Sequence, residues 1–166
     1  GSKTGIVRVL KGDALKPRGN GPKIIAHIVN DRSLTWGGGF AKQVAIHFSE
    51  AQLDFRRWGH IPGNHKLGLT HFFGNPQHIE IASMVAQQGF GASQTPRIRY
   101  PALERCLGEV RDHARANGAS VHMPRIGCGQ AGGKWEVINE LIERELLRHG
   151  VAVTIYDLPS GTRSRK

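Results

Sequence analysis

The sequence has 166 residues, of which 22 are glycine and 39% are hydrophobic, and its formal net charge is +10. The length suits one domain, and no apolar run reaches the roughly 18 residues that a membrane-spanning helix needs, which excludes an integral membrane protein. The positive charge favours polyanionic partners such as nucleic acid or polyphosphate, but it indicates neither a fold nor a site.

In the first half of the chain, β-branched runs alternate with stretches of helical spacing. Strands are predicted where apolar runs are bounded by Gly or Pro, at Ile6–Leu10, Lys23–Val29, Leu67–Phe73 and His78–Val85. Helices are predicted at Lys42–Phe48 and Glu50–Trp58.

The second half has clearer periodicity. Apolar residues recur at helical spacing over Tyr100–Asn117, and Gly118 is expected to end that helix. A further helix is predicted over Lys134–His149, between strands at Ser120–Met123 and Val151–Tyr156. The order ββααββαβαβ indicates an α/β fold in which helices pack on a mixed sheet.

The ends of the chain and its cysteines bear on its setting. We expect residues 1–5 to be a tag or linker remnant, 6–159 one domain, and 160–166 a basic flexible tail. The chain opens without the segments typical of a secretory signal. Cys106 and Cys128 lack CxxC spacing, which argues against a disulfide framework or a Cys-based zinc site. We therefore expect an intracellular protein, either cytoplasmic or nuclear.

Two glycine-rich segments each stand between a predicted strand and a predicted helix. They are Trp36–Phe40 (WGGGF) and Ile126–Gly133 (IGCGQAGG). Glycine lets backbone N–H groups approach a ligand without a Cβ in the way, and a following helix dipole favours phosphate oxygens. The glycines could instead only form tight turns, but two such loops favour a shared diphosphate cradle.

The second loop also contains G-x-G-x-x-G, at Gly127, Gly129 and Gly132. In a Rossmann fold this fingerprint follows the first strand, and an acidic residue follows about 20 residues later. Here only one helix and one strand follow, which argues against a Rossmann enzyme. His60 and His65 are spaced H-x4-H in a Pro/Gly-rich stretch without a neighbouring carboxylate, which favours solvent-exposed loop histidines over a metal site.

Several stretches together resemble one known family, the macrodomains, which bind ADP-ribose. They are GDA at 12–14, IIAHIVND at 24–31, WGGGFA at 36–41, MVAQ at 84–87 and ASVHMPRIGCG at 119–129. They span nearly the whole chain in the family's order. Within the family, the chain resembles the subgroup of the poly(ADP-ribose)-activated chromatin remodeller and the terminal ADP-ribose protein glycohydrolase. The resemblance implies a three-layer α/β/α fold with a mixed six-stranded sheet.

The resemblance also implies roles for individual residues. Asp13 would accept a hydrogen bond from the adenine amino group, loop 127–133 would hold the diphosphate, and loop 30–40 would wrap the distal ribose. Gln87 and Gln88 would contact that ribose, and Tyr156 would lie at the adenine pocket or in the core. The residues implied to bind ligand are Asp13, Ala14, Asn30, Trp36, Gly37, Gly38, Gly39, Phe40, Gln87, Ile126, Gly127, Cys128, Gly129, Gln130, Ala131, Gly132, Tyr156 and Asp157.

Catalysis is a separate question, because the glycohydrolase of this subgroup uses a lysine and an aspartate. This chain has SMVAQQG where the lysine would stand and Ala131 where the aspartate would stand. The remaining candidates are Asp31 and Asn30, which could position a water, and His27, which could act as general acid or base. His27 could equally be a buried histidine within the sheet, and Asp31 a loop cap. Cys128 is disfavoured as a nucleophile.

Three hypotheses follow. The chain is a hydrolase that acts on terminal ADP-ribose or ADP-ribose 1″-phosphate through a positioned water, which we favour slightly by analogy. Alternatively, it is a non-catalytic reader of mono- or poly-ADP-ribose, or a nucleic-acid-binding protein that uses charge alone. We expect ADP-ribose, or ADP-ribosylated protein or nucleic acid, as partner, with nucleic-acid contact through the basic surface. We expect a monomer with no membrane association, no cofactor and no metal.

Overall fold

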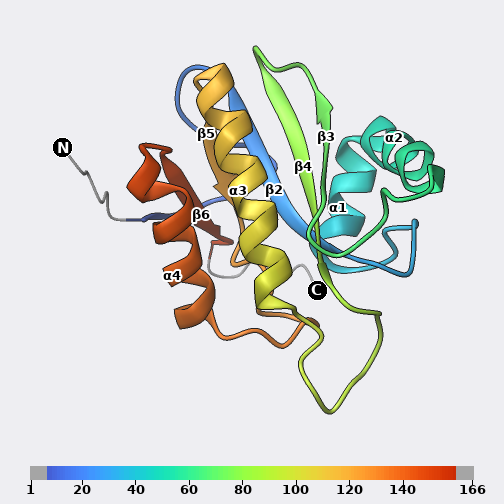
Figure 1. The fold of residues 1–166 in the computed structure, drawn as a ribbon. Helices are drawn as coiled ribbons and strands as arrows, with labels where there is room; N and C mark the ends of the chain where they lie inside the picture. The colour runs from blue at the N-terminus through green and yellow to red at the C-terminus, as the bar shows by residue number, and fades with distance from the viewer. Residues whose placement is uncertain (1–6, 160–166) are drawn as a thin grey trace.

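One mixed sheet of six strands runs through residues 7–159, the part of the chain that the computed structural model describes (Figure 1). The strands are β1 (Arg8–Lys11), β2 (Lys23–Asn30), β3 (Thr70–Gly74), β4 (Ile79–Gln87), β5 (Ser120–Met123) and β6 (Val153–Asp157). Their order is β1-β6-β5-β2-β4-β3, and every neighbouring pair is parallel except β3 with β4. This order is not that of a Rossmann fold.

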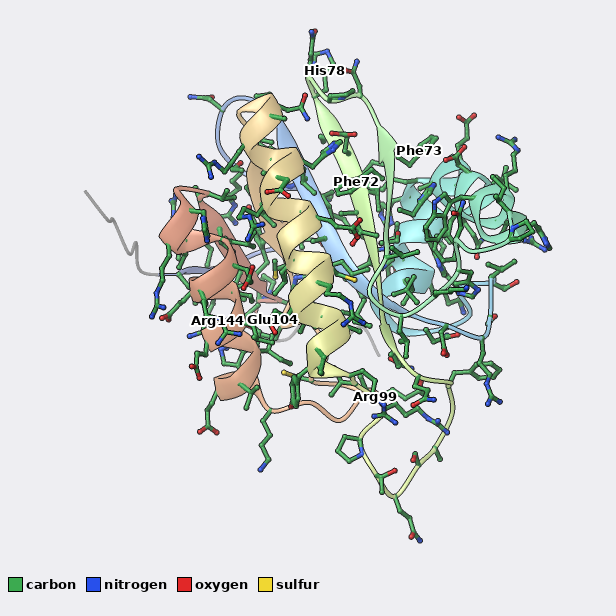
Figure 2. All side chains as sticks on the ribbon, in the orientation of Figure 1. Phe72, Phe73, His78, Arg99, Glu104 and Arg144 are labelled. Carbon is green, nitrogen blue, oxygen red and sulfur yellow. The ribbon has the colours of Figure 1, made fainter. Side chains whose placement is uncertain are left out.

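Helices cover both faces of the sheet. They are α1 (Gly39–His47), α2 (Ser49–His60), α3 (Tyr100–Asn117) and α4 (Trp135–Glu145), with a 3-10 turn η1 (Leu147–His149) after α4. Figure 1 shows α1 and α2 together on the right, and α3 and α4 on the front and left. An ion pair between Arg144 and Glu104, labelled in Figure 2, joins α4 to α3 at 2.8 Å.

The residues of β2 explain why both faces are covered. Ile24 and Ala26 belong to the buried cluster that includes α3 and α4. Ile25 and Val29 belong to the cluster that includes α1 and α2. Because successive side chains of a strand point to opposite faces, such an apolar strand needs a helical layer on each side. The expected three-layer α/β/α fold with a mixed six-stranded sheet is confirmed.

The predicted order of helices and strands is also confirmed, and α3 has the predicted bounds. Gly118 follows α3 with a left-handed φ of +63°, and its N–H donates to the carbonyl of Ala114. Glycine reaches this conformation without a Cβ penalty, and so ends the helix as expected.

Some element ends differ from the prediction. α1 begins at Gly39, three residues before the predicted start, because the extended Gly38 forms its N-cap. β3 begins at Thr70 rather than at Leu67. The helix predicted over 134–149 ends at Glu145, and the chain then tightens into η1.

Two predicted segments, the remnant at 1–5 and the basic tail at 160–166, lie outside the described residues, as does Ile6. Within residues 7–159, none of the helices is both long enough and apolar enough to cross a membrane.

Candidate functional site

The five parallel strands end at one edge of the sheet, and a cavity of about 1280 Å³ opens there. Ligands of open α/β sheets bind in this position, beyond the carboxyl ends of the strands. The cavity is larger than the roughly 300–1,000 Å³ typical of small-molecule sites, so it has room for a ligand of dinucleotide size. The predicted binding residues that line it are Asp13, Ala14, Asn30, Trp36, Gly37, Gly38, Gly39, Phe40, Gln87, Ile126, Gly127, Gly129, Gln130, Ala131, Tyr156 and Asp157.

Four predicted site residues do not line this cavity, namely Asp31, Gln88, Cys128 and Gly132. The Cys128 thiol lies 3.6 Å from the carbonyl oxygen of Ile126, and burial raises its pKa. A raised pKa keeps the thiol protonated, which agrees with the prediction that Cys128 is no nucleophile.

The first glycine loop leads directly into α1. Gly37, Gly38 and Gly39 all line the cavity, and α1 begins at Gly39. The first N–H groups of a helix have no partner within the helix, and the dipole places partial positive charge there. This end of the cavity therefore suits an anionic group.

The second glycine loop is closed by its own backbone. The N–H of Gly133 donates to the carbonyl of Gly127 at 2.7 Å, and that of Gly132 to the carbonyl of Gly129 at 3.0 Å. The N–H groups of Gly129, Gln130 and Ala131 have no backbone acceptor in the described part of the chain, and all three residues line the cavity. They form a second set of donors for a ligand.

Gly127 is required by packing as well as by backbone conformation. Its φ is +73°, and a Cβ there would lie 2.6 Å from Cδ1 of Ile98 and 3.0 Å from Cδ1 of Ile138. The loop can therefore pack this closely against α4 and the segment before α3 only with glycine at this position.

A β-bulge shapes the end of β2, where the register with β4 shifts between Val29 and Asn30. Asn30 lines the cavity, and its side-chain oxygen accepts the N–H groups of Arg32 at 2.9 Å and Ser33 at 2.7 Å, so its amide nitrogen is the group left to donate to a ligand. The neighbouring Asp31 carboxylate accepts the N–H of Gly89 at 2.8 Å. Asp31 therefore braces the loop after β4.

His27 lies at the floor of the cavity and is 2% exposed. Its Nε2 is 2.8 Å from the hydroxyl of Ser83, and its ring meets Trp36 edge to face at 5.1 Å. Burial, with a smaller contribution from His71, lowers the pKa of His27 to about 3. The imidazole is therefore neutral near pH 7, so it has no imidazolium proton to donate as a general acid, and its low pKa makes it a weak general base.

The opposite end of the cavity is built around Asp13 and Tyr156. The Asp13 carboxylate accepts the N–H of Leu15 at 3.0 Å. Tyr156 is 3% exposed, and its hydroxyl accepts the N–H of Arg18 at 2.8 Å and pairs with Nδ1 of His122 at 2.8 Å. Tyr156 therefore both packs in the core and forms part of the cavity wall.

Arg125 and Phe90 are among the lining residues that were not predicted from the sequence. Arg125 forms a two-point ion pair with Asp157 at 2.8 and 2.9 Å. Phe90 is 56% exposed at the cavity rim. The sequence did contain a signal for Arg125, because this cation directly precedes the second glycine loop. Phe90 lies between Gly89 and Gly91, and no sequence pattern marks it as a site residue.

The histidine pair needs one correction. His60 is exposed as expected, but His65 is partly buried and its Nε2 donates to the carbonyl of Asn30 at 2.8 Å. His65 therefore supports the end of β2 rather than lying free in a loop. Within residues 7–159, no group of three or more His, Cys, Asp or Glu side chains is arranged to hold a metal ion.

Comparison with curated proteins identifies relatives over most of the chain. It is 30% identical over 159 residues to the Danio rerio chromodomain-helicase-DNA-binding protein 1-like, which covers 90% of this chain but 15% of that protein. It is 33% identical over 60 residues to the human ADP-ribose glycohydrolase OARD1, covering 36% of this chain and 40% of that one. The chain thus spans less than two thirds of these relatives. No family model matches the sequence.

Solved structures match over most of the chain. A protein of unknown function from Bacteroides thetaiotaomicron matches with a TM-score of 0.86 and 40% identity, covering 92% of this chain and 98% of that one. The Thermosipho africanus DarTG in complex with ADP-ribose is similar in fold, with a TM-score of 0.68 and 18% identity, covering 84% of this chain and 39% of that one.

The macrodomain protein from Streptomyces coelicolor matches with a TM-score of 0.80 and 35% identity, covering 93% of this chain and all of that one. The agreement extends to both sequence and fold and covers nearly all of both chains. This chain belongs to the macrodomain family.

Proposed function

We propose that the cavity binds ADP-ribose, including the terminal ADP-ribose of a modified protein or nucleic acid. The observation that carries the proposal is that two sets of backbone N–H donors, at residues 37–39 and 129–131, line one cavity of about 1280 Å³. A diphosphate is the ligand group that two facing N–H clusters suit. The names of two similar proteins, an ADP-ribose glycohydrolase and a complex with ADP-ribose, support the choice of ligand.

The two ends of the cavity suit the two ends of this ligand. Asp13 offers a carboxylate that could accept the adenine amino group. At the other end, Asn30 offers its amide nitrogen to the ribose hydroxyls, and Gln87, whose Nε2 donates to the Gly89 carbonyl at 3.0 Å, offers its amide oxygen. Phe90 and Gly91 also line the cavity, and they follow Gly89, whose N–H donates to Asp31 beside Asn30, so we expect a linkage to a modified partner to leave the cavity there.

We further propose that the chain recognises ADP-ribose without hydrolysing it. The side chains that could act on the linkage already have other partners: Asp31 holds the N–H of Gly89, and His27 is neutral and bonded to Ser83. The described lining residues include no lysine. Two carboxylates line the cavity, those of Asp13 and Asp157, and the Asp157 carboxylate is paired with Arg125. These contacts favour a non-catalytic reader of ADP-ribose. They argue against the hydrolase, which was the hypothesis that the sequence slightly favoured.

Calorimetric titration with ADP-ribose tests the binding. Gly38 has an extended backbone, and a Cβ there would meet nothing within 4 Å, so Gly38→Glu adds a carboxylate to the cradle without strain. Repulsion of the diphosphate should weaken binding about 100-fold or more. Gly108→Glu on α3, where a Cβ would contact other atoms only beyond 3.5 Å, adds the same charge outside the cavity and should bind like the wild type.

Turnover is tested on ADP-ribose 1″-phosphate and on ADP-ribosylated protein and DNA. The expected result is no release of phosphate or ADP-ribose by a preparation that binds ADP-ribose. Release that disappears in Asp31→Ala, with binding preserved, would overturn the reader and restore the hydrolase. Equal binding by wild type and Gly38→Glu would count against the cavity as the site.

We also propose a reducing, intracellular setting and contact with nucleic acid through the basic surface. Both cysteines are free, Cys106 within the core and Cys128 within the second glycine loop, which suits such a setting. The net charge of +10 supports association with polyanions.

A further inference from the structure

Arg125 is held in place from two directions at the wall of the cavity. Its Nε and Nη2 donate to the two carboxylate oxygens of Asp157 at 2.8 and 2.9 Å. Its guanidinium carbon lies 5.0 Å from the ring centroid of Trp135, the first residue of α4. The ion pair restrains one edge of the guanidinium plane and the indole covers one side, so the plane has a defined orientation.

The rest of the guanidinium is available to a ligand. Arg125 lines the cavity, whereas Trp135 does not, and the Arg125 side chain is 38% exposed. With one edge on Asp157 and one side against Trp135, the parts that remain are Nη1 and the side away from the indole. Arg125 therefore presents a flat, fixed surface in the lining of the cavity that also contains Asp13 and Tyr156.

The chemistry of this surface suits an aromatic base better than a phosphate. A guanidinium plane stacks readily on aromatic rings, and protein–nucleic acid contacts use it in this way. Asp157 neutralises the charge of Arg125, so the pair adds little attraction for an anion. Tyr156, the aromatic residue of the lining nearest in sequence to this pair, is 3% exposed, so its ring has little surface to offer.

We propose that Arg125, backed by Trp135 and oriented by Asp157, is the surface on which the purine base of the ligand stacks. This inference rests on the proposed function, because it assigns the base of ADP-ribose to this wall. Arg125 is then a specificity-determining residue that distinguishes nucleotides from base-free phosphates.

Paired substitutions separate stacking from charge. Arg125→Lys keeps the charge and loses the plane, whereas Arg125→Tyr keeps a plane and loses the charge. Stacking predicts that affinity for ADP-ribose falls about 10-fold in Arg125→Lys and is largely restored in Arg125→Tyr. A phosphate contact predicts the reverse order and would overturn the inference. Thermal melts establish that each variant is folded. Trp135→Leu keeps Arg125 and Asp157 but removes the indole behind the guanidinium, and it should bind ADP-ribose about 3-fold more weakly than the wild type.

The NMR signal of the Arg125 Nε–H group tests the stacking in the wild-type protein, without any substitution. Because an aromatic ring shields protons above its face, ADP-ribose should move the Arg125 Nε–H signal upfield, whereas inorganic diphosphate, which has no base, should not. An unchanged signal with bound ADP-ribose overturns this inference but leaves the proposed function intact. Absence of ADP-ribose binding by the wild type overturns both.

Discussion

Two histidines on neighbouring strands, His27 on β2 and His122 on β5, are each 2% exposed. Burial is the main cause that lowers the pKa of His27 to about 3 and that of His122 to about 4, with smaller contributions from His71 and Lys23 respectively. Both therefore stay neutral in the folded protein at pH values at which an unfolded chain protonates its histidines, whose ordinary pKa is about 6.5.

The free energy of unfolding should consequently fall as the pH drops from about 6.5 toward about 4. In this window the unfolded state binds protons that the folded state excludes, so each histidine contributes a slope of up to about 1.4 kcal/mol per pH unit. Above about pH 6.5 neither state binds the proton, and the contribution to stability is fully present. Urea unfolding at several pH values measures the slope.

The control for this prediction is a comparison of variants. His27→Gln should make the pH dependence of the free energy of unfolding shallower by up to the contribution of one bound proton, about 1.4 kcal/mol per pH unit. His60→Gln, at an exposed position in α2, should leave this slope unchanged. An unaltered slope in His27→Gln would mean that His27 binds its proton as readily in the folded state as in the unfolded state, which would contradict the prediction.

At the scale of elements, the segment between β4 and α3 is held by two arginines. Arg97 donates to the carbonyls of Gly91 at 2.9 Å, Gln88 at 3.2 Å and Ala92 at 3.2 Å. Arg99, labelled at the foot of α3 in Figure 2, donates to the side-chain oxygen of Gln88 at 2.8 Å. These bonds hold the segment that carries Phe90 to the cavity rim.

Arg97→Ala should therefore loosen this segment without unfolding the protein. Hydrogen exchange of amides in residues 88–95 should accelerate at least about 10-fold, because the loop loses three side-chain hydrogen bonds worth roughly 1 kcal/mol each. Exchange in β2 and β4 should stay unchanged. Arg57→Ala in α2, whose contact with Asp54 is a weak 3.7 Å surface pair, is the matched control and should alter neither region. Uniform acceleration over the whole sheet would contradict the prediction.

The sequence predicted elements best where local patterns decided them. α3 has its expected bounds because its apolar spacing is unbroken and Gly118 supplies the left-handed cap. The start of α1 was missed because glycine is a poor helix former, and only the fold shows that Gly39 opens the helix. The break after Glu145 was missed because the apolar spacing continues through Leu146, while the backbone turns to meet Val151, whose N–H donates to the Leu146 carbonyl at 3.0 Å.

At the scale of the whole molecule, the cavity depends on contacts that sequence patterns do not contain. The two glycine loops were predicted because each has its own local signature. Arg125 was missed because its role comes from Asp157, 32 residues later at the end of β6, and from Trp135 at the start of α4. Asp31 was assigned a possible chemical role on resemblance, and its contact with Gly89, 58 residues away, appears only in the fold.

The distribution of charge leads to a last prediction about the molecule as a whole. The net charge is +10, yet within the described residues Arg125 is the only lysine or arginine of the cavity lining, and Asp157 pairs with it. The diphosphate cradle is built from backbone N–H groups, whereas a polyanion would meet the exposed lysines and arginines elsewhere. Affinity for ADP-ribose should therefore change less than about 3-fold between about 50 and 200 mM NaCl, while affinity for a DNA duplex should fall at least about 10-fold.

Fluorescence anisotropy with a labelled duplex, and calorimetry with ADP-ribose, measure the two dependences on one preparation. Saturating ADP-ribose should leave the duplex bound, and Gly38→Glu should lose ADP-ribose while it keeps the duplex, because the two ligands use separate surfaces. If both affinities fell equally with salt, or if ADP-ribose released the duplex, the basic surface and the cavity would form a single binding site. The basic surface would then help to bind ADP-ribosylated nucleic acid together with the cavity, and it would not be a separate binding surface for nucleic acid.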